Sequence, residues 1–286
     1  MKELGLINGR LIKMDEAVIT MEDRGHQFGD GVYEVTKVYN GKCFALKPHM
    51  DRLYQSLRAI RIPATYTFEE LVQFHEALIK ESGIMEGAIY LQITRGAAPR
   101  VHPFPEHVVP CLTMSIRGNG PANQELRKNG VGIILIPDER WLRCDIKSLN
   151  LLGNVLGKQQ AKEAGCYEAV MVRADYVTEG TSSNFFVVKD GVIWTHPATN
   201  LILKGITRTI LLERLARELN LTILEKEFDK AFLNGISEAF LSGTSTEFMP
   251  VVSIDGKKIN DGSVGPITRK LQLAYTELID KECGRN

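Results

Sequence analysis

The sequence predicts an α+β fold made of two unequal domains. Segments with apolar residues at three- and four-residue intervals, typical of helices, are interspersed with alternating apolar runs, typical of strands. A chain of 286 residues is also long enough for two ordinary domains. Near its middle, a stretch rich in Gly, Pro and Asn has little to bury. We therefore expect a small domain over residues 1–117, a linker over 118–125 and a larger domain over 126–286.

The N-terminal domain should begin as an antiparallel sheet. Asn8-Gly9 and Asn40-Gly41 each lie between short apolar runs, and such pairs suit the two-residue turns of hairpins. A capping box of Thr67 and Glu70 opens one of two amphipathic helices expected to cover this sheet. The expected helices span 49–60 and 67–80, and two further strands span 88–96 and 111–118.

The C-terminal domain should be rich in strands. Apolar runs over 132–137, 168–180 and 184–196 predict strands, with turns at Ala174-Asp175 and Asp190-Gly191. Helical spacing returns three times, in the segments 149–164, 206–219 and 266–281. A cleft between two such domains would be a common place for a small-molecule site.

Charge and composition exclude several classes of function. The 35 basic and 35 acidic residues cancel, so the chain has no global attraction for nucleic acids or anionic membranes. No apolar run has the length of a signal peptide or a membrane span, and we expect a cytoplasmic protein. The five cysteines and six histidines show no metal-binding spacing, so we expect free thiols and no metal site.

Three segments could carry chemistry, although each also has an ordinary structural explanation. Lys147 follows an apolar run and precedes a predicted helix, where its amine could be partly desolvated, but such a lysine is commonly solvated. Glu179 lies in a polar cluster over 178–184, which also suits a plain turn. Gly205 and Thr207 begin a predicted helix whose free N–H groups could bind a phosphate or simply be capped.

Six segments occur together in the order and spacing of a known family. They are RGHQFGDGVYEV (24–35), HMDRL (49–53), ITRGAAPRVHPFP (93–105), RWLRCDIKSLNLL (140–152), VTEGTSSN (177–184) and LKGITR (203–208). The set resembles the fold-type IV pyridoxal-phosphate enzymes of the class IV aminotransferase family, most closely the D-amino acid aminotransferases. The resemblance spans nearly the whole chain. It implies two α/β domains with pyridoxal 5′-phosphate in the cleft between them.

The resemblance also implies residues that bind the cofactor. Lys147 matches the lysine that forms the Schiff base and moves the proton. Glu179 matches the acidic partner of the pyridine nitrogen, and Arg52 matches the arginine of the cofactor phosphate. The other implied cofactor-binding residues are Leu203, Ile206, Thr207, Gly243 and Thr244. The last two lie in LSGTST, where the family usually has a hydroxyl residue in place of the glycine.

Substrate choice is implied to depend on Tyr33, Arg100 and His102, which match residues that bind the substrate α-carboxylate. On an exposed loop, Arg100 and His102 would otherwise be ordinary surface residues. In the resembling enzymes this pair is supplied across a dimer interface, so a homodimer is implied. Branched-chain L-amino acid aminotransferases of the same fold lack the pair, which makes it the best discriminator in the chain.

The expected activity is therefore a ping-pong transamination. A D-amino acid such as D-alanine gives its amine to the cofactor, and a 2-oxo acid such as 2-oxoglutarate then receives it, with Lys147 moving the proton. The rival hypotheses are a branched-chain L-amino acid aminotransferase or an aminodeoxychorismate lyase of the same fold. A non-catalytic binding protein that keeps only the phosphate site is a third. Residue types alone leave open the side-chain preference, oligomers beyond a dimer, and a role in supplying D-glutamate or D-alanine.

Overall fold

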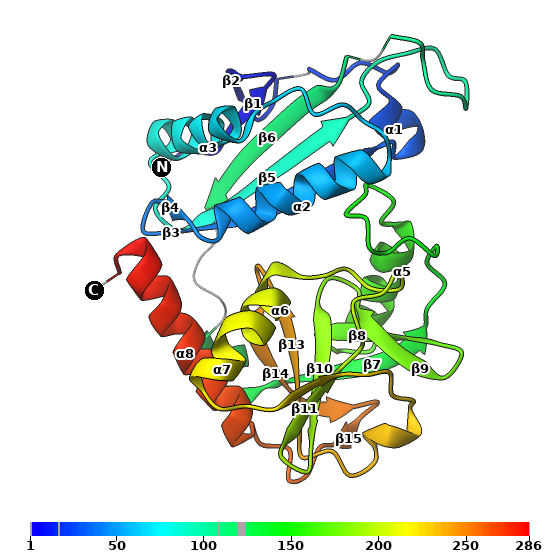
Figure 1. The fold of residues 1–286 in the computed structure, drawn as a ribbon, viewed down its shortest axis with the longest axis vertical. Helices are drawn as coiled ribbons and strands as arrows, with labels where there is room; N and C mark the ends of the chain where they lie inside the picture. Colours follow the sequence, from blue (N-terminus) through cyan, green and yellow to red (C-terminus); the bar gives the residue numbers. More distant parts are fainter. Residues whose placement is uncertain (1, 17, 108, 119–123, 286) are drawn as a thin grey trace. The chain divides into compact units, whose positions relative to one another are not determined.

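The computed structural model describes residues 2–16, 18–107, 109–118 and 124–285, which divide into two units with separate sheets (Figure 1). Unit 1 comprises the described residues within 1–120, 146–150 and 279–286, and unit 2 those within 121–145 and 151–278. The predicted α+β class is confirmed. The predicted linker, 118–125, falls mainly on 119–123, which lie outside the described residues, so it stays a prediction. None of the described helices has the length and apolar character needed to cross a bilayer.

Unit 1 contains an antiparallel sheet of six strands in the order β2-β1-β6-β5-β3-β4. Its strands are β1 (Leu4–Ile7), β2 (Arg10–Lys13), β3 (Gly31–Tyr39), β4 (Lys42–Cys43), β5 (Gly87–Thr94) and β6 (Cys111–Gly118). The turns at Asn8-Gly9 and Asn40-Gly41 have positive φ at both positions, as a type I′ hairpin turn requires. Both predicted hairpins are confirmed.

Two long helices cover one face of this sheet, and Figure 1 shows both lying along it. They are α2 (Leu46–Ala59) and α3 (Phe68–Ser82), and a short helix, α1 (Arg24–Phe28), precedes β3. Leu53 and Leu57 of α2 and Leu71 and Leu78 of α3 are buried in a single core with the strands. The capping box at Thr67 is confirmed. Helix α2 begins three residues before the predicted start, because Pro48 falls in its first turn, where no N–H is needed.

Unit 2 contains a mixed sheet of nine strands. Its order is β12-β11-β10-β13-β14-β7-β8-β9, and β15 pairs with β14. The strands are β7 (Val131–Pro137), β8 (Glu168–Arg173), β9 (Tyr176–Gly180), β10 (Asn184–Lys189), β11 (Val192–Thr195), β12 (Ile223–Glu225), β13 (Glu238–Gly243), β14 (Glu247–Ile254) and β15 (Lys257–Lys258). The predicted turns at Ala174-Asp175 and Asp190-Gly191 are confirmed by their positive φ values.

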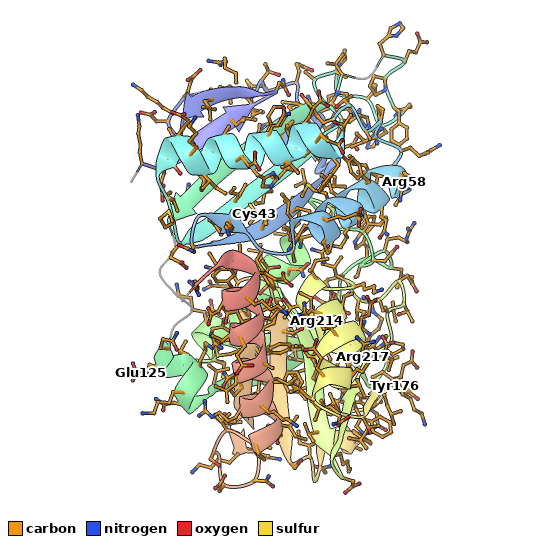
Figure 2. All side chains as sticks on the ribbon, turned by 60° about the vertical axis from the view of Figure 1, so that its left-hand side comes forward. Cys43, Arg58, Glu125, Tyr176, Arg214 and Arg217 are labelled. Carbon is orange, nitrogen blue, oxygen red and sulfur yellow. The ribbon has the colours of Figure 1, made fainter. Side chains whose placement is uncertain are left out.

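The helices of unit 2 are α4 (Gln124–Asn129), α5 (Leu152–Glu163), α6 (Ile206–Ile210), α7 (Ala216–Glu218) and α8 (Pro266–Cys283), of which α8 belongs to unit 2 up to Leu278. Figures 1 and 2 both show α8 beside α6 and α7. An edge-to-face ring pair connects α8 to the sheet, since the ring centres of Phe248 in β14 and Tyr275 are 5.2 Å apart. A 3₁₀ turn (Ala231–Leu233) completes the unit.

Two predicted helices differ from the structure. The predicted helix over 149–164 begins only at Leu152, because Ser148 and Leu149 pair with the edge of β3 instead. The predicted helix over 206–219 is one helical rod whose middle turn, Leu211–Leu215, is a wider π turn between α6 and α7. Ile210, Leu211, Leu215 and Leu219 recur at intervals that also fit a continuous α-helix, so their spacing could not reveal this change.

Candidate active site

Lys147 lies on a short segment of unit 1 whose backbone is hydrogen-bonded to β3 on one side and to α2 on the other. Tyr33 N–H donates to the Lys147 carbonyl at 3.0 Å, and the Lys147 N–H donates to Ser56 Oγ of α2 at 3.2 Å. The side chain is half-buried, and its Nζ lies 4.1 Å from the centre of the Tyr33 ring. Two predicted site residues, Tyr33 and Lys147, are therefore in contact, and the lysine amine extends from a fixed backbone.

Glu34, the next residue of β3, holds Arg52 in place. Arg52 Nε donates to Glu34 Oε1 at 2.7 Å and Nη2 donates to Oε2 at 2.9 Å, and His49 Nδ1 lies 2.7 Å from Oε2. Burial would raise the pKa of the Glu34 carboxyl, but Arg52 and His49 outweigh it and lower that pKa to about 2. Burial lowers the pKa of His49. The Arg52 fork is thus held by a permanently ionised carboxylate.

Sequence reasoning missed Glu34 and His49. A signal was present, because Glu34 shares one strand face with Val32 and Val38, which belong to the apolar core. A carboxylate in a strand whose alternate residues are apolar and buried needs a buried cation to offset the cost of burying its charge. Nothing local identifies that cation as Arg52, which is 18 residues away on a helix.

Glu179 in unit 2 has four hydrogen bonds to its carboxylate. Arg140 Nη1 donates to Oε1 at 2.6 Å and Asn184 Nδ2 donates to Oε2 at 3.0 Å, while the Leu203 N–H lies 3.2 and 3.1 Å from the two oxygens. Burial raises the pKa of this carboxyl to about 7, and Arg140 acts in the opposite direction. Glu179 can therefore gain or lose a proton near neutral pH.

Arg140, which connects Glu179 to a second carboxylate, was also missed. Its Nε and Nη2 each donate to Asp138 at 2.9 Å, and Asp138 also forms an ion pair with Arg173, whose Nη2 lies 3.0 Å from Oδ1. Burial would raise the pKa of Asp138, but Arg140 and Arg173 lower it. Arg140 is thus shared between Asp138 and Glu179, so only part of its charge stabilises the Glu179 carboxylate.

The start of α6 brings the predicted phosphate-binding residues near Glu179. Asn184 Nδ2 donates both to Glu179 and, at 2.8 Å, to the Leu203 carbonyl. At Gly205, a Cβ would come within 2.2 Å of Asn184 Oδ1, so this close approach requires glycine. Ile206 and Thr207 follow, both buried, and the Thr207 hydroxyl lies 3.3 Å from the Tyr275 hydroxyl of α8.

The end of β13 adds a residue that sequence reasoning did not include. Ser242 pairs with Asn184 in the sheet, and its buried hydroxyl has no hydrogen-bond partner among the described residues. Gly243 and Thr244 follow and are half-buried. A buried unpaired hydroxyl, beside backbone N–H groups at a helix start, fits an anionic group such as a phosphate.

Arg100 and His102 lie together on an exposed loop of unit 1. The Arg100 guanidinium lies 4.9 Å and the His102 ring 5.6 Å from the centre of the Phe28 ring. Arg24 donates to the carbonyls of Val101 at 2.7 Å and His102 at 3.2 Å, which fixes the loop backbone. Within the described residues, no hydrogen bond or ring contact joins either side chain to Tyr33. Both residues are exposed and lie against Phe28.

Comparisons with known proteins agree on one family. The model of the family Amino-transferase class IV matches residues 31–254. A D-alanine aminotransferase of Staphylococcus epidermidis is 45% identical over 273 residues, which cover 96% of each chain. Among solved structures, the branched-chain amino acid aminotransferase of Escherichia coli superposes with a TM-score of 0.90 at 26% identity, over 97% of this chain and 95% of that one. The branched-chain enzyme from T.th., solved with pyridoxamine 5′-phosphate, has a TM-score of 0.89 at 27% identity, over 99% and 95%.

Proposed function

The chain belongs to the class IV aminotransferase family, and on that premise we propose that it transfers an amino group from a D-amino acid such as D-alanine to a 2-oxo acid such as 2-oxoglutarate. The observation that carries this proposal is the 45% identity to a D-alanine aminotransferase over 96% of both chains. The branched-chain enzymes share the fold, but only at 25–28% identity. The branched-chain enzymes have a similar backbone but a more distant sequence than the D-alanine aminotransferase. The comparison therefore favours the D-amino acid activity over the branched-chain activity.

Class IV aminotransferases use pyridoxal 5′-phosphate, which when bound supplies an electrophilic carbon and an electron sink for the substrate Cα carbanion. We propose that Lys147 would hold this group covalently and that its amine, once released, would take the proton from the substrate Cα and give it to the electrophilic carbon of the cofactor. Its extended backbone and its contact with Tyr33 support this role, because they limit where Nζ can reach.

We assign Glu179 to the ring nitrogen of the cofactor, where a carboxyl with a pKa of about 7 can share a proton with a weak base. The proposed phosphate site combines Arg52 with donors of α6 and the β13 end. These donors are Ile206, Thr207, Gly243 and Thr244, and we add Ser242. Leu203, whose N–H donates to Glu179, is proposed as a further cofactor-binding residue with no phosphate role. The chemistry of the set supports the assignment, since it offers hydroxyl, amide and guanidinium donors to an anion.

We propose that Tyr33, Arg100 and His102 bind the substrate carboxylate, and that Arg100 and His102 serve a second copy of the chain. Their exposed position on an anchored loop supports this. Unit 2 also exposes large apolar side chains around the start of α5, where Gly153 lies against the Arg140 stem. The exposed apolar residues are Trp141, Leu142, Leu152, Val155 and Leu156. Such a patch is typical of a surface covered in a homodimer.

A cytoplasmic location is proposed as well. All five cysteines are free, which is the state that a reducing compartment maintains.

A substrate comparison tests the proposed activity. The protein purified with its cofactor is assayed with D-alanine, L-alanine and L-leucine, each with 2-oxoglutarate. We expect D-alanine to give a kcat/KM at least about 100-fold above both L-amino acids, because the carboxylate site fixes which face of Cα meets the lysine. A preference for L-leucine would support the branched-chain alternative. Formation of 4-aminobenzoate from aminodeoxychorismate would support the lyase.

A further inference from the structure

A buried arginine holds residues 100–104, which we call the carboxylate loop because they include Arg100 and His102. This arginine, Arg24 of α1, donates from Nη1 to the Val101 carbonyl at 2.7 Å and from Nη2 to the His102 carbonyl at 3.2 Å. Figure 1 shows the segment after β5 leaving the sheet beside α1. Arg24 is 3% exposed, so the loop backbone is fixed by a side chain that is itself enclosed.

A second buried arginine contacts the end of the carboxylate loop. The guanidinium of Arg95 lies 3.6 Å from the centre of the Phe104 ring, where a cation and the face of an aromatic ring attract each other. The same guanidinium donates to the carbonyls of Ile60 at 2.7 Å and Arg61 at 2.9 Å. Arg95 is 2% exposed, so its charge is removed from water and depends on these partners.

Asp30 connects the two arginines. Arg24 Nε donates to Asp30 Oδ2 at 2.8 Å, Arg95 Nε donates to the same oxygen at 2.7 Å, and Arg95 Nη2 donates to Oδ1 at 3.0 Å. Among the described residues, no other carboxylate forms an ion pair with either arginine. One carboxylate at the start of β3 thus offsets two buried cations, and each cation holds a different part of the carboxylate loop.

From this network we propose that Asp30 is a positioning residue for the binding of the substrate carboxylate. It acts through Arg24 and Arg95, which keep Arg100 and His102 in one place. Exposed side chains bind an anion weakly unless they are held, because ordering them costs conformational entropy. The inference rests on the proposed function, since it takes Arg100 and His102 as the groups that bind the carboxylate.

A role of Asp30 in stability alone would have a different kinetic effect. Loss of folded enzyme lowers the rate per protein molecule but leaves KM unchanged. A displaced carboxylate loop instead raises KM for both substrates, because D-alanine and 2-oxoglutarate each present an α-carboxylate. The division of the effect between KM and kcat therefore separates positioning from stability.

Steady-state kinetics of the protein purified with its cofactor test the proposal. Asp30→Asn removes the charge and keeps the side-chain shape. We expect it to raise KM for D-alanine and for 2-oxoglutarate at least about tenfold, while kcat per bound cofactor stays within about threefold of the wild type. The matched control is Glu86→Gln, which removes an ion pair with Arg285 at the opposite end of β5 and should leave both KM values unchanged.

A second variant decides the matter if Asp30→Asn does not fold. Phe104→Leu removes the ring against Arg95 at a side chain that is 44% exposed, and it leaves the hydrogen bonds of Asp30 in place. We expect it to raise both KM values about threefold. D-alanine turnover with wild-type KM values in Phe104→Leu, or in folded Asp30→Asn, would overturn this inference alone. A wild type that does not convert D-alanine would overturn the proposed function and this inference with it.

Discussion

Unit 1 and unit 2 each bury a glutamate against an arginine, yet the pKa values of the two carboxyls differ widely. The pKa of Glu34 is lowered to about 2, whereas that of Glu179 is raised to about 7. Both side chains are buried to a similar degree, at 0% and 5% exposure. Burial alone therefore does not decide the protonation state of either carboxyl.

The difference comes from the hydrogen bonds that each arginine donates to its glutamate. Arg52 donates two hydrogen bonds to Glu34, which also accepts from His49. Arg140 donates one hydrogen bond to Glu179 and directs two side-chain N–H groups to Asp138, whose charge itself raises the pKa of Glu179. Two hydrogen bonds from Arg52 and the contact with His49 thus make Glu34 a fixed anion, whereas one hydrogen bond from Arg140, opposed by the charge of Asp138, leaves Glu179 a carboxyl that exchanges protons near pH 7.

The largest expected effect is on the unit 1 pair. Glu34→Gln leaves Arg52 buried without its carboxylate, and we expect a loss of about 3–5 kcal/mol in the free energy of unfolding. Urea unfolding of the variant measures this loss, with the exposed Glu81→Gln as the control expected to change by less than about 0.5 kcal/mol. A Glu34→Gln protein as stable as the wild type would show that Arg52 finds another partner and that the carboxylate does not hold it.

A pH series separates the two carboxyls. The folded pKa of Glu179 is raised from 4.5, so its stabilisation is complete below pH 4.5 and is lost as the pH rises through about 7. The folded pKa of Glu34 is lowered from 4.5, so its stabilisation is present above pH 4.5 and is lost as the pH falls through about 2. Between pH 4.5 and 7 the cofactor-free wild type should therefore lose about 3 kcal/mol more than Glu179→Gln.

Urea unfolding at those two pH values, on both proteins, gives this difference. The same change with pH in wild type and in Glu179→Gln would mean that Glu179 is ionised throughout the interval. It would then be a fixed anion like Glu34, and the contrast between the two units would disappear.

The smallest expected effect concerns the unpaired hydroxyl in unit 2. Ser242→Ala removes a buried group that has no partner among the described residues, so the cofactor-free protein should keep its stability within about 0.5 kcal/mol. Its affinity for pyridoxal 5′-phosphate should fall about tenfold, because the hydroxyl is proposed to donate to the phosphate. Unfolding and cofactor titrations measure the two quantities. An unchanged affinity would remove Ser242 from the proposed site.

Short-range patterns predicted much of the fold. The turns at Asn8-Gly9 and Asn40-Gly41 and the capping box at Thr67 depend only on residues within a few positions, and the structure has all of them. The start of α5 could not be predicted in this way. Residues 148–149 have helical spacing, yet they pair with β3, more than 100 residues earlier in the chain.

In the candidate site, too, features set by local sequence were predicted and long-range contacts were not. Residue types and family motifs pointed to Lys147, Glu179 and Arg52, but the hydrogen-bond partners of Glu179 and Arg52 were missed. Arg140 is 39 residues from Glu179 along the chain, and Glu34 is 18 residues from Arg52. Such pairs form only once the register of strands and helices is fixed, so no local spacing reveals them.

The central claim is that the amine of Lys147 holds the cofactor and moves the substrate proton. Borohydride reduction of the protein purified with its cofactor, followed by peptide mass spectrometry, tests it most directly. We expect the reduced cofactor to be attached to Lys147, and Lys147→Ala to convert D-alanine at least about 1,000-fold more slowly than the wild type. Attachment to another lysine, or a Lys147→Ala protein with the wild-type rate, would contradict the account.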